Sequence, residues 1–509
     1  MFVGSLQYRM GCVAGVWAGP VCSNGSFEPM GNFKFYFWAG LSALLLASRL
    51  AHVNILWADE DYHLAAAIQV LHGKMLYRDL WYDKPPLNAL LLTLFGAWPG
   101  WPLRVASMLL GVAGSAAAYR FAAAAWGKRE GFLAAALLAF FQVFYFPKAV
   151  LTLEPETLLV FPHILAVYWA WRGRALAAGV AAGIGFLLHP RAAFILLSCF
   201  VFAPREWLRL GVGFLLPNAV AIGWLVGQSA WSAYLDQVWR WGLLYAASPP
   251  EEPAANRWLR LAGWCGFHAA LLIGAALPWR SSALQGRLDH HDRWRWMAWC
   301  AIALIGAAAG WRFAPHYLNI LLPPLVLVAS AGLARLRSPA IAAAVAIALA
   351  VPAVRFGPRY FSLAAEDFTG TPHSWIDVRM DQESRTGAAT IRALQRPGDT
   401  LFVWGYRPNV VVYTRLPVAG RLWDSQAVTG VPADRHLGSA VPVDAEWAAR
   451  NRAALLQTSP TILSDGLSAY NSQLDIRNFP DLTEWFARYC AVPSTSSGMK
   501  VYRLCASAP

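Results

Sequence analysis

The sequence predicts a mainly helical protein that crosses a membrane about eleven times and carries a small α/β domain at its C-terminus, outside the membrane. Hydrophobic residues make up 57% of the 509 residues and charged residues only 14%, whereas soluble domains carry about a quarter charged residues. Apolar runs recur up to residue 355, and the remaining residues alternate between short strand-like and helix-like segments. This pattern excludes both a disordered chain and a single soluble domain.

Eleven apolar runs, separated by short polar loops, predict the membrane spans. A helix needs about 20 residues to cross a bilayer, so the ends of the shorter runs are approximate. One further run, 85–98, is too short to cross and predicts a helix on the membrane surface. The predicted spans are 35–56, 101–125, 131–149, 157–171, 175–188, 191–203, 210–227, 258–277, 296–310, 318–334 and 339–354.

The spans divide the chain into three parts. Residues 1–34 are expected to form a cytoplasmic segment, because Met10–Cys22 is apolar but Gly-rich and weakly charged in front, unlike a signal peptide; Met30 is an alternative start. Residues 35–356 form the membrane domain, whose long first outer loop covers 57–100. Residues 357–509 form the C-terminal domain.

The net charge of +13 lies almost entirely in the membrane part. Residues 1–356 hold 27 basic and 15 acidic side chains, and residues 357–509 hold 15 and 14. Twelve basic residues fall in alternate loops, which places these loops in the cytoplasm and the C-terminal domain in the periplasm of a bacterial inner membrane. No nucleic-acid-binding motif accompanies the charge, so we expect no nucleic-acid partner. The basic loops are 128–129, 172–174, 205–209, 280–295 and 335–337.

The C-terminal part is predicted to be a small α/β domain. Strand-like runs at Thr400–Trp404, Thr461–Ser464 and Lys500–Leu504 alternate with helix-like runs at Glu383–Gln395 and Asp481–Tyr489. The domain has neither a Gly-rich phosphate loop nor a nucleophile elbow.

Seven cysteines occur in the chain, and none has a metal-binding spacing. Only Cys490 and Cys505 fall in the exported part, where a disulfide is chemically possible. We expect these two residues to be unpaired or buried thiols.

Acidic residues gather at the outer ends of the predicted spans. Asp59, Glu60 and Asp61 follow the first span, and Glu154 and Glu156 precede the fourth. Three adjacent acids repel one another, which raises the pKa of at least one of them unless a cation or metal compensates. This arrangement suits a catalytic base or a carboxylate pair that holds a divalent ion. Acids at a helix start are also favoured by the helix dipole without any catalytic role.

Isolated cations and histidines occur at the same outer face. They are Lys84 in the first loop, His189 and Arg191 after the fifth span, and Arg312 and His316 after the ninth. Any one of them alone suits a side chain that reaches from a helix end to the lipid headgroups. As a set on one face, they also suit the binding of an anionic, lipid-linked phosphate.

The order of these features resembles the GT-C superfamily of membrane glycosyltransferases, in particular the protein mannosyltransferases and the bacterial aminoarabinose transferases. The resemblance covers residues 35–355, with a weaker echo at Phe402-Val403-Trp404-Gly405. In one departure, His189-Pro190-Arg191 stands where many relatives have Lys-Gly-Pro or Lys-Gln-Pro. The residues that carry the resemblance are Asp59-Glu60-Asp61-Tyr62, Tyr77-Arg78-Asp79, Lys84-Pro85-Pro86-Leu87, Leu153-Glu154-Pro155, His316-Tyr317-Leu318 and Leu321-Leu322-Pro323-Pro324.

The resemblance implies an enzyme that moves a sugar from a polyprenyl-phosphate donor to a lipid, glycan or protein acceptor on the periplasmic side. It implies Asp59 as the base or metal-linked carboxylate and Glu154 as the second-loop acid, while Asp61 competes for the role of base. A divalent cation, Mg²⁺ or Mn²⁺, would bind at Asp59 and Glu60, although the sequence does not require one. The expected donor-phosphate ligands are Lys84, Arg191, Arg312 and His316, and further candidates are Glu60, Tyr62, Tyr77, His189 and Tyr317.

A membrane transporter or flippase of lipid-linked saccharides is the alternative. Such a protein would show internal repeats and polar residues near the middle of the membrane. The sequence has no repeated halves, and most of the distinctive acids lie at one boundary. Arg49, inside the first span, is the one feature that favours this alternative.

Overall fold

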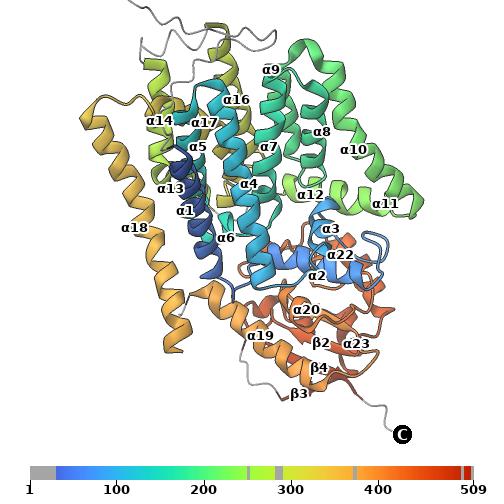
Figure 1. The fold of residues 1–509 in the computed structure, drawn as a ribbon. Coiled ribbons are helices and arrows are strands. Elements are labelled where there is room, and N and C mark those ends of the chain that lie inside the picture. The colour runs from blue at the N-terminus through green and yellow to red at the C-terminus, as the bar shows by residue number, and fades with distance from the viewer. Residues whose placement is uncertain (1–29, 249–252, 281–289, 371–374, 494–497, 506–509) are drawn as a thin grey trace, which may run out of the picture.

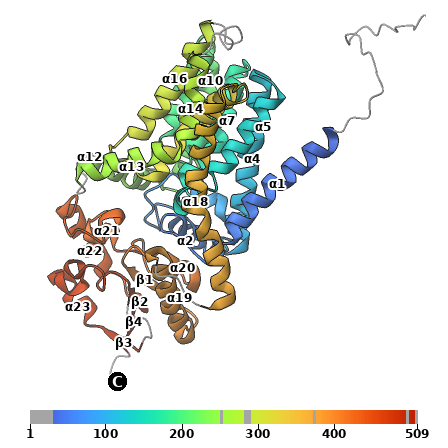
Figure 2. The same ribbon diagram turned by 90° about the vertical axis from the view of Figure 1, so that its left-hand side faces the viewer.

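Figures 1 and 2 show a computed structural model of the chain, which describes residues 30–248, 253–280, 290–370, 375–493 and 498–505. A bundle of helices forms one part of the molecule, and a small sheet with its own helices lies against one end of that bundle (Figure 1). The expected N-terminal segment up to residue 29, with Cys12 and Cys22, lies outside the described residues.

Helices occupy all eleven apolar runs of the membrane part. Short helices also form in the outer loops, where α2 and α3 follow the first long helix. In chain order the helices are α1 Met30–Leu50, α2 Glu60–Leu71, α3 Leu87–Thr93, α4 Trp101–Ala125, α5 Lys128–Phe141, α6 Pro147–Val150, α7 Pro155–Trp171, α8 Ala175–Phe186, α9 Ala192–Phe202 and α10 Trp207–Gly227. They continue with α11 Trp231–Tyr234, the π-helix η2 Leu235–Arg240, α12 Trp241–Ala247, α13 Ala254–Phe267, α14 Ala269–Arg280, α16 His290–Ala308, the 3₁₀ turn η3 Pro315–Leu321, α17 Leu322–Leu333 and α18 Pro339–Thr369.

Four helical segments within the described ranges are long and apolar enough to cross a membrane, and α13 with α14 makes a fifth if the bent pair counts as one span. The number of eleven spans therefore stays a prediction. The run 258–277 is not one straight helix, because α13 and α14 meet at an angle of 70°. His268 lies at the bend with its ring buried between Trp264 and Phe141, at centroid distances of 4.2 and 4.8 Å. The four segments are Trp101–Ala125, Pro204–Gly227, Pro315–Leu333 and Pro339–Glu366.

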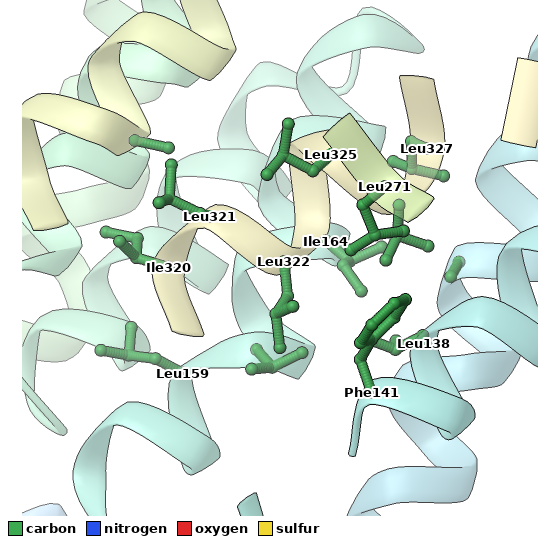
Figure 3. Close-up of a cluster of buried hydrophobic side chains, with 14 of the residues drawn as sticks. Leu138, Phe141, Leu159, Ile164, Leu271, Ile320, Leu321, Leu322, Leu325 and Leu327 are labelled. Atoms are coloured by element: carbon green, nitrogen blue, oxygen red, sulfur yellow. The ribbon is translucent and has the colours of Figure 1, made fainter. Parts of the chain in front are cut away.

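Apolar side chains of several helices meet in one core inside the bundle (Figure 3). Leu138 and Phe141 of α5 face Leu271 of α14 and Leu322 of α17 there. Glycines permit a close helix crossing between α8 and α10: a Cβ on Gly179 would lie only 2.2 Å from a backbone oxygen of α10. Lipid tails are as apolar as these side chains, so close van der Waals packing, rather than transfer from water, stabilises this core.

The C-terminal part contains a four-stranded sheet with the strand order β1-β2-β4-β3. β1 and β2 pair in parallel, whereas β4 pairs antiparallel with both β2 and β3. α18 runs on past residue 356 and leads towards this region, as Figure 2 shows. The elements are α19 Ile376–Leu394, β1 Leu401–Trp404, α20 Asn409–Thr414, α21 Gln426–Thr429, α22 Ala445–Leu456, β2 Ile462–Asp465, α23 Thr483–Phe486, β3 Tyr489–Val492 and β4 Lys500–Leu504. Short 3₁₀ turns of this part are Ala433–Arg435, Ser472–Leu474, Ile476–Asn478 and Pro480–Leu482, and one further turn, Pro204–Glu206, joins α9 to α10 in the bundle.

Two predictions for this domain were wrong. The run Asp481–Tyr489 is not one helix: α23 covers four residues, and Tyr489 already begins β3, where its side chain is buried. The pairing of β3 with β4 then brings Cys490 and Cys505 together, with a Cα–Cα distance of 5.3 Å, and they form a disulfide instead of remaining free thiols. The sequence could not reveal this pairing, because the helical interpretation hid strand β3.

Candidate functional site

Asp59 lies directly before α2, in the long first loop, and its side chain is one third exposed. Its Oδ2 accepts a hydrogen bond from Lys148 Nζ at 3.1 Å, and its Oδ1 accepts one from the Tyr406 hydroxyl at 3.4 Å. The backbone of Asp59 has a φ of +81°, a conformation that side-chain-bearing residues rarely adopt. Such strain persists only where the surrounding contacts enforce it, and it is concentrated at functional sites.

The charges around Asp59 keep it ionised at neutral pH. Burial raises the pKa of this carboxyl, but the cationic Lys148, with further contributions from His316 and Lys84, lowers it more, and the net pKa falls well below the ordinary value. Asp59 is therefore a carboxylate whose charge is balanced mainly by Lys148.

The other two acids of the first loop have different surroundings. Asp61 is buried: its Oδ2 accepts a hydrogen bond from the backbone N–H of Asn409 at 3.2 Å. Burial, reinforced by the charge of Asp59, raises the pKa of Asp61 well above its ordinary value. Glu60 points into the bundle, where both of its oxygens accept hydrogen bonds from the Arg104 guanidinium at 2.9 and 3.0 Å, and one of them also accepts the Leu153 N–H at 2.9 Å. The three adjacent acids thus fill three different environments.

Glu154 and Glu156 flank the proline that starts α7. Glu154 is buried, and neither of its carboxylate oxygens has a hydrogen-bond partner in the part of the chain that the structure describes. Burial, together with Glu156 and Asp59, raises the pKa of Glu154 well above its ordinary value. Glu156, in contrast, accepts a hydrogen bond from Arg191 Nη1 at 3.1 Å and lies 3.4 Å from His189 Nε2.

The predicted cations meet around these acids. Arg191 stacks over the Tyr317 ring, with its guanidinium carbon 3.6 Å from the ring centroid. Lys84 Nζ donates a hydrogen bond to Asp83 Oδ2 at 2.9 Å, and a third of its side chain is exposed. His316 contributes to the electrostatic field at both Asp59 and Glu156. Four segments that are far apart in the sequence therefore converge on one site.

Arg312 lies at the boundary between the bundle and the C-terminal domain. Its Nη1 donates to Asp434 Oδ2 at 2.8 Å, its Nη2 donates to the Tyr245 carbonyl at 3.0 Å, and its guanidinium lies over the Tyr245 ring. The structure thus gives Arg312 a protein carboxylate as its partner and places it at the rim of the site.

The remaining candidates support the first loop. Tyr77 donates its hydroxyl hydrogen to the Lys84 carbonyl at 2.8 Å, and it has a φ of +69°. Tyr62 is buried and stacks on three other aromatic rings. His189 accepts the Arg191 N–H through Nδ1 at 3.0 Å, and burial lowers its pKa to about 3. These contacts hold Lys84 and Arg191 in place.

Three residues of this site were not predicted from the sequence: Lys148, Tyr406 and Asn409. Lys148 is the lone cation at the end of the apolar run 131–149, and this position would have identified it as a candidate site residue. Tyr406 and Asn409 lie just beyond β1, at the carboxyl end of a parallel strand, where α/β sheets commonly place ligand-binding groups. Nothing in the local sequence indicates that this end of the sheet faces Asp59.

A divalent cation does not fit the acidic pair that was expected to hold it. Arg104 occupies both oxygens of Glu60, and Lys148 occupies Asp59 Oδ2. Within the described ranges, no three His, Cys, Asp or Glu side chains are grouped so that they could share a metal ion.

Comparison with known proteins adds the family context. Residues 83–231 match the family model described as dolichyl-phosphate-mannose-protein mannosyltransferase. The whole fold is similar to the crystal structure of ArnT from Cupriavidus metallidurans bound to undecaprenyl phosphate, with a TM-score of 0.58 and 15% identity over 94% of this chain and 99% of that chain. The chain has the ArnT-like GT-C fold.

The apo structure of ArnT from the same organism gives the same result, with a TM-score of 0.56 and 14% identity over 94% of this chain and 99% of that chain. A comparison with curated protein sequences gave no match. The resemblance to the GT-C superfamily, of the protein mannosyltransferase and ArnT-like kind, is therefore confirmed, as is the polytopic helical fold with a small C-terminal α/β domain.

Proposed function

We propose that this GT-C protein transfers a sugar from a polyprenyl-phosphate donor to a lipid, glycan or protein acceptor at the outer face of the membrane. The observation that carries the proposal is a partly exposed carboxylate, Asp59, that faces Lys148, Lys84 and His316. Sugar transfer from a phosphate needs both a base for the acceptor hydroxyl and cations for the departing phosphate. The fold and the match to the mannosyltransferase family support the same reaction class.

Asp59 is the proposed base because, of the three adjacent acids Asp59, Glu60 and Asp61, it is the one whose side chain is partly exposed. Its pKa in the free protein is low, which would make it a weak base. An arriving donor phosphate would give Lys148 and Lys84 a second anionic partner, weaken their hold on Asp59 and so increase its basicity. Glu154, with its raised pKa, would hold a proton next to Asp59 and keep the local field from becoming more negative.

Lys84, Arg191 and His316 are the proposed ligands of the donor phosphate. Arg191 is fixed by Glu156 and by the Tyr317 ring, so its guanidinium is held in one orientation. Arg312 would act from the rim, because its contacts with Asp434 and Tyr245 tie the loop before His316 to the C-terminal domain. No step of this proposal uses a metal ion.

We further infer that the site faces the periplasm of a bacterial inner membrane, with the N-terminus in the cytoplasm. The turn between α9 and α10 lies at the opposite end of the bundle from the sheet (Figure 1). This turn carries Arg205, and Arg209 follows in the first turn of α10. The Cys490–Cys505 disulfide also suits an oxidising compartment. A cysteine placed at Gly398 should react with a membrane-impermeant reagent in intact spheroplasts, and protection of this cysteine would reverse the orientation.

The decisive experiment combines a cell-based and a purified assay. Mass spectrometry of glycolipids and glycans from cells with and without the gene should show one sugar modification that disappears with the gene. The purified protein should then transfer that sugar from its polyprenyl-phosphate form. Unchanged glycolipids and glycans, or no consumption of any polyprenyl-phosphate sugar, would overturn the proposal.

A further inference from the structure

The first outer loop and the C-terminal domain run side by side near Lys84. The Trp81 N–H donates to the Arg421 carbonyl at 2.7 Å, and the Trp423 indole N–H donates to the Trp81 carbonyl at 2.8 Å. The Trp423 ring also stacks on Tyr62 at a centroid distance of 5.1 Å. These contacts fix the segment 421–424 against the segment 81–84.

Asp424 follows Trp423 at the end of this contact and is fully buried. Its Oδ1 accepts the Gln426 N–H at 2.9 Å, whereas its Oδ2 is buried without a hydrogen-bond partner in the described part of the chain. Asp83, in the facing segment, shows the same asymmetry: its Oδ2 binds Lys84, and its Oδ1 is buried and unpaired among the described residues.

Two buried carboxyl groups that each leave one oxygen unpaired are unfavourable if both are ionised. A proton on one of them turns an unpaired acceptor into a donor. Burial, with a further contribution from Asp83, raises the pKa of Asp424 to about 7, although Lys84 opposes the shift. The titratable and charged groups that face Asp424 are Asp83, Lys84 and Tyr62. Beside these groups, Asp424 stays protonated at mildly acidic pH.

We propose that Asp424 is a positioning residue for the donor phosphate: in its neutral form it stabilises the carboxylate of Asp83 when Lys84 leaves Asp83 to bind that phosphate. The inference rests on the proposed function, because it takes Lys84 as a phosphate ligand. No covalent bond changes in this step. The Lys84 ammonium exchanges Asp83 Oδ2 for a phosphate oxygen, and the Asp424 carboxyl donates its hydrogen towards Asp83.

The inference predicts a particular pH dependence. Above the pKa of Asp424, two carboxylates rather than one hold Lys84, and both repel the incoming phosphate. Donor affinity should therefore fall as the pH rises from about 6 to about 8, by roughly tenfold. The probe should be a polyprenyl methyl phosphodiester, since its single phosphate charge does not change in this range.

Three variants test this role. Asp424→Asn keeps the size of the side chain and an N–H donor but cannot ionise, so it should bind the probe as well at high pH as the unaltered protein does at low pH. Asp424→Ala has no donor and cannot ionise, so it should bind the probe several-fold more weakly than the unaltered protein does at low pH and should show no pH dependence from this position. Asp481→Asn, which alters a partly exposed carboxyl of the same domain paired with Arg452, should keep the pH dependence of the unaltered protein.

Each outcome decides one question. If Asp424→Asn keeps the original pH dependence, or loses affinity as Asp424→Ala does, then Asp424 does not act through its proton and this inference fails. If the unaltered protein does not bind the phosphodiester at any pH, or if Lys84→Gln binds it equally well, then the proposed function or its assignment of Lys84 fails instead.

Discussion

Lys148 Nζ lies 3.1 Å from Asp59 Oδ2, and this pair joins the loop after α1 to the short helix before α7. Both side chains are partly exposed, so the ion pair adds little to the stability of the fold. Its importance is electrostatic, because it keeps a strained, accessible carboxylate ionised next to the cations that would bind phosphate.

Removal of the cation at Lys148 should shift the pH range of activity. Lys148 lowers the pKa of Asp59, so in Lys148→Met this carboxyl should protonate at a higher pH, and the acidic limb of the rate profile should move upwards. The measurement is kcat/KM against pH, with Lys500→Met, at the exposed first residue of strand β4, as the control. An unchanged acidic limb would show that Asp59 is not the titrating base.

Asp59→Asn should reduce sugar transfer by about a hundredfold or more, because general-base contributions are of that order. Asp61→Asn should have a smaller effect, since Asp61 has a raised pKa and asparagine resembles its protonated form. Rates should be compared at equal amounts of membrane-inserted protein. A larger loss in Asp61→Asn would assign the base to Asp61.

Glu154→Gln and Glu156→Gln should separate kcat from KM. Glu154 has no hydrogen-bond partner among the described residues, so Glu154→Gln should not lower Tm. Because glutamine resembles the protonated form that the raised pKa favours, kcat should fall less than in Asp59→Asn. Glu156 fixes Arg191 and His189, so its replacement should mainly raise the KM for the donor. Equal effects on both constants would mean that the wrong acid has been assigned to catalysis.

Loss of the disulfide should weaken the C-terminal domain. The bond closes a sequence separation of 15 residues, and chain entropy assigns about 3 kcal/mol to a loop of that size. Cys490→Ser should therefore lower the free energy of unfolding of this domain, measured by urea-dependent proteolysis. Alkylation followed by peptide mapping should label Cys490 and Cys505 only after reduction, whereas Cys199, Cys265 and Cys300 are free thiols in either case. Labelling of Cys490 or Cys505 before reduction would contradict the pairing.

The buried ion pair between Glu60 and Arg104 should be structural. Both side chains are almost fully buried, and removal of one partner from such a pair typically costs about 3–5 kcal/mol. Arg104→Met alone should lower Tm strongly, and the double variant with Glu60→Gln should recover part of the loss. If the double variant is no more stable than the single one, the pair does not stabilise the fold in this way.

Much of the helical part could be predicted from the sequence, because an apolar run that forms a membrane helix is a property of neighbouring residues alone. The predicted span 101–125 coincides with α4, and Asp59 and Glu154 do lie in one site. The bend at His268 could not be predicted, since it depends on the packing of the His268 ring between Trp264 and Phe141.

Long-range pairing limited the remaining predictions. Glu60 binds Arg104 inside the bundle, so its side chain does not share the surroundings of Asp59, although Glu60 and Asp59 are adjacent in the sequence. Tyr406 and Asn409 reach the first loop from about 350 positions away, as the separations of their hydrogen bonds to Asp59 and Asp61 show. Only the folded arrangement of the sheet against α2 brings such residues together.

The packing of the sheet against α2 also determines when the site is completed during biosynthesis. The bundle can insert helix by helix as the chain is made, but Asp59 acquires its Tyr406 partner only after β1 has formed and docked. A chain truncated before residue 400 would carry the carboxylate, Lys84 and Arg191 and still have an incomplete site. We therefore expect newly made molecules to remain inactive until their last hundred or so residues have folded, which keeps unfinished chains from consuming the donor lipid.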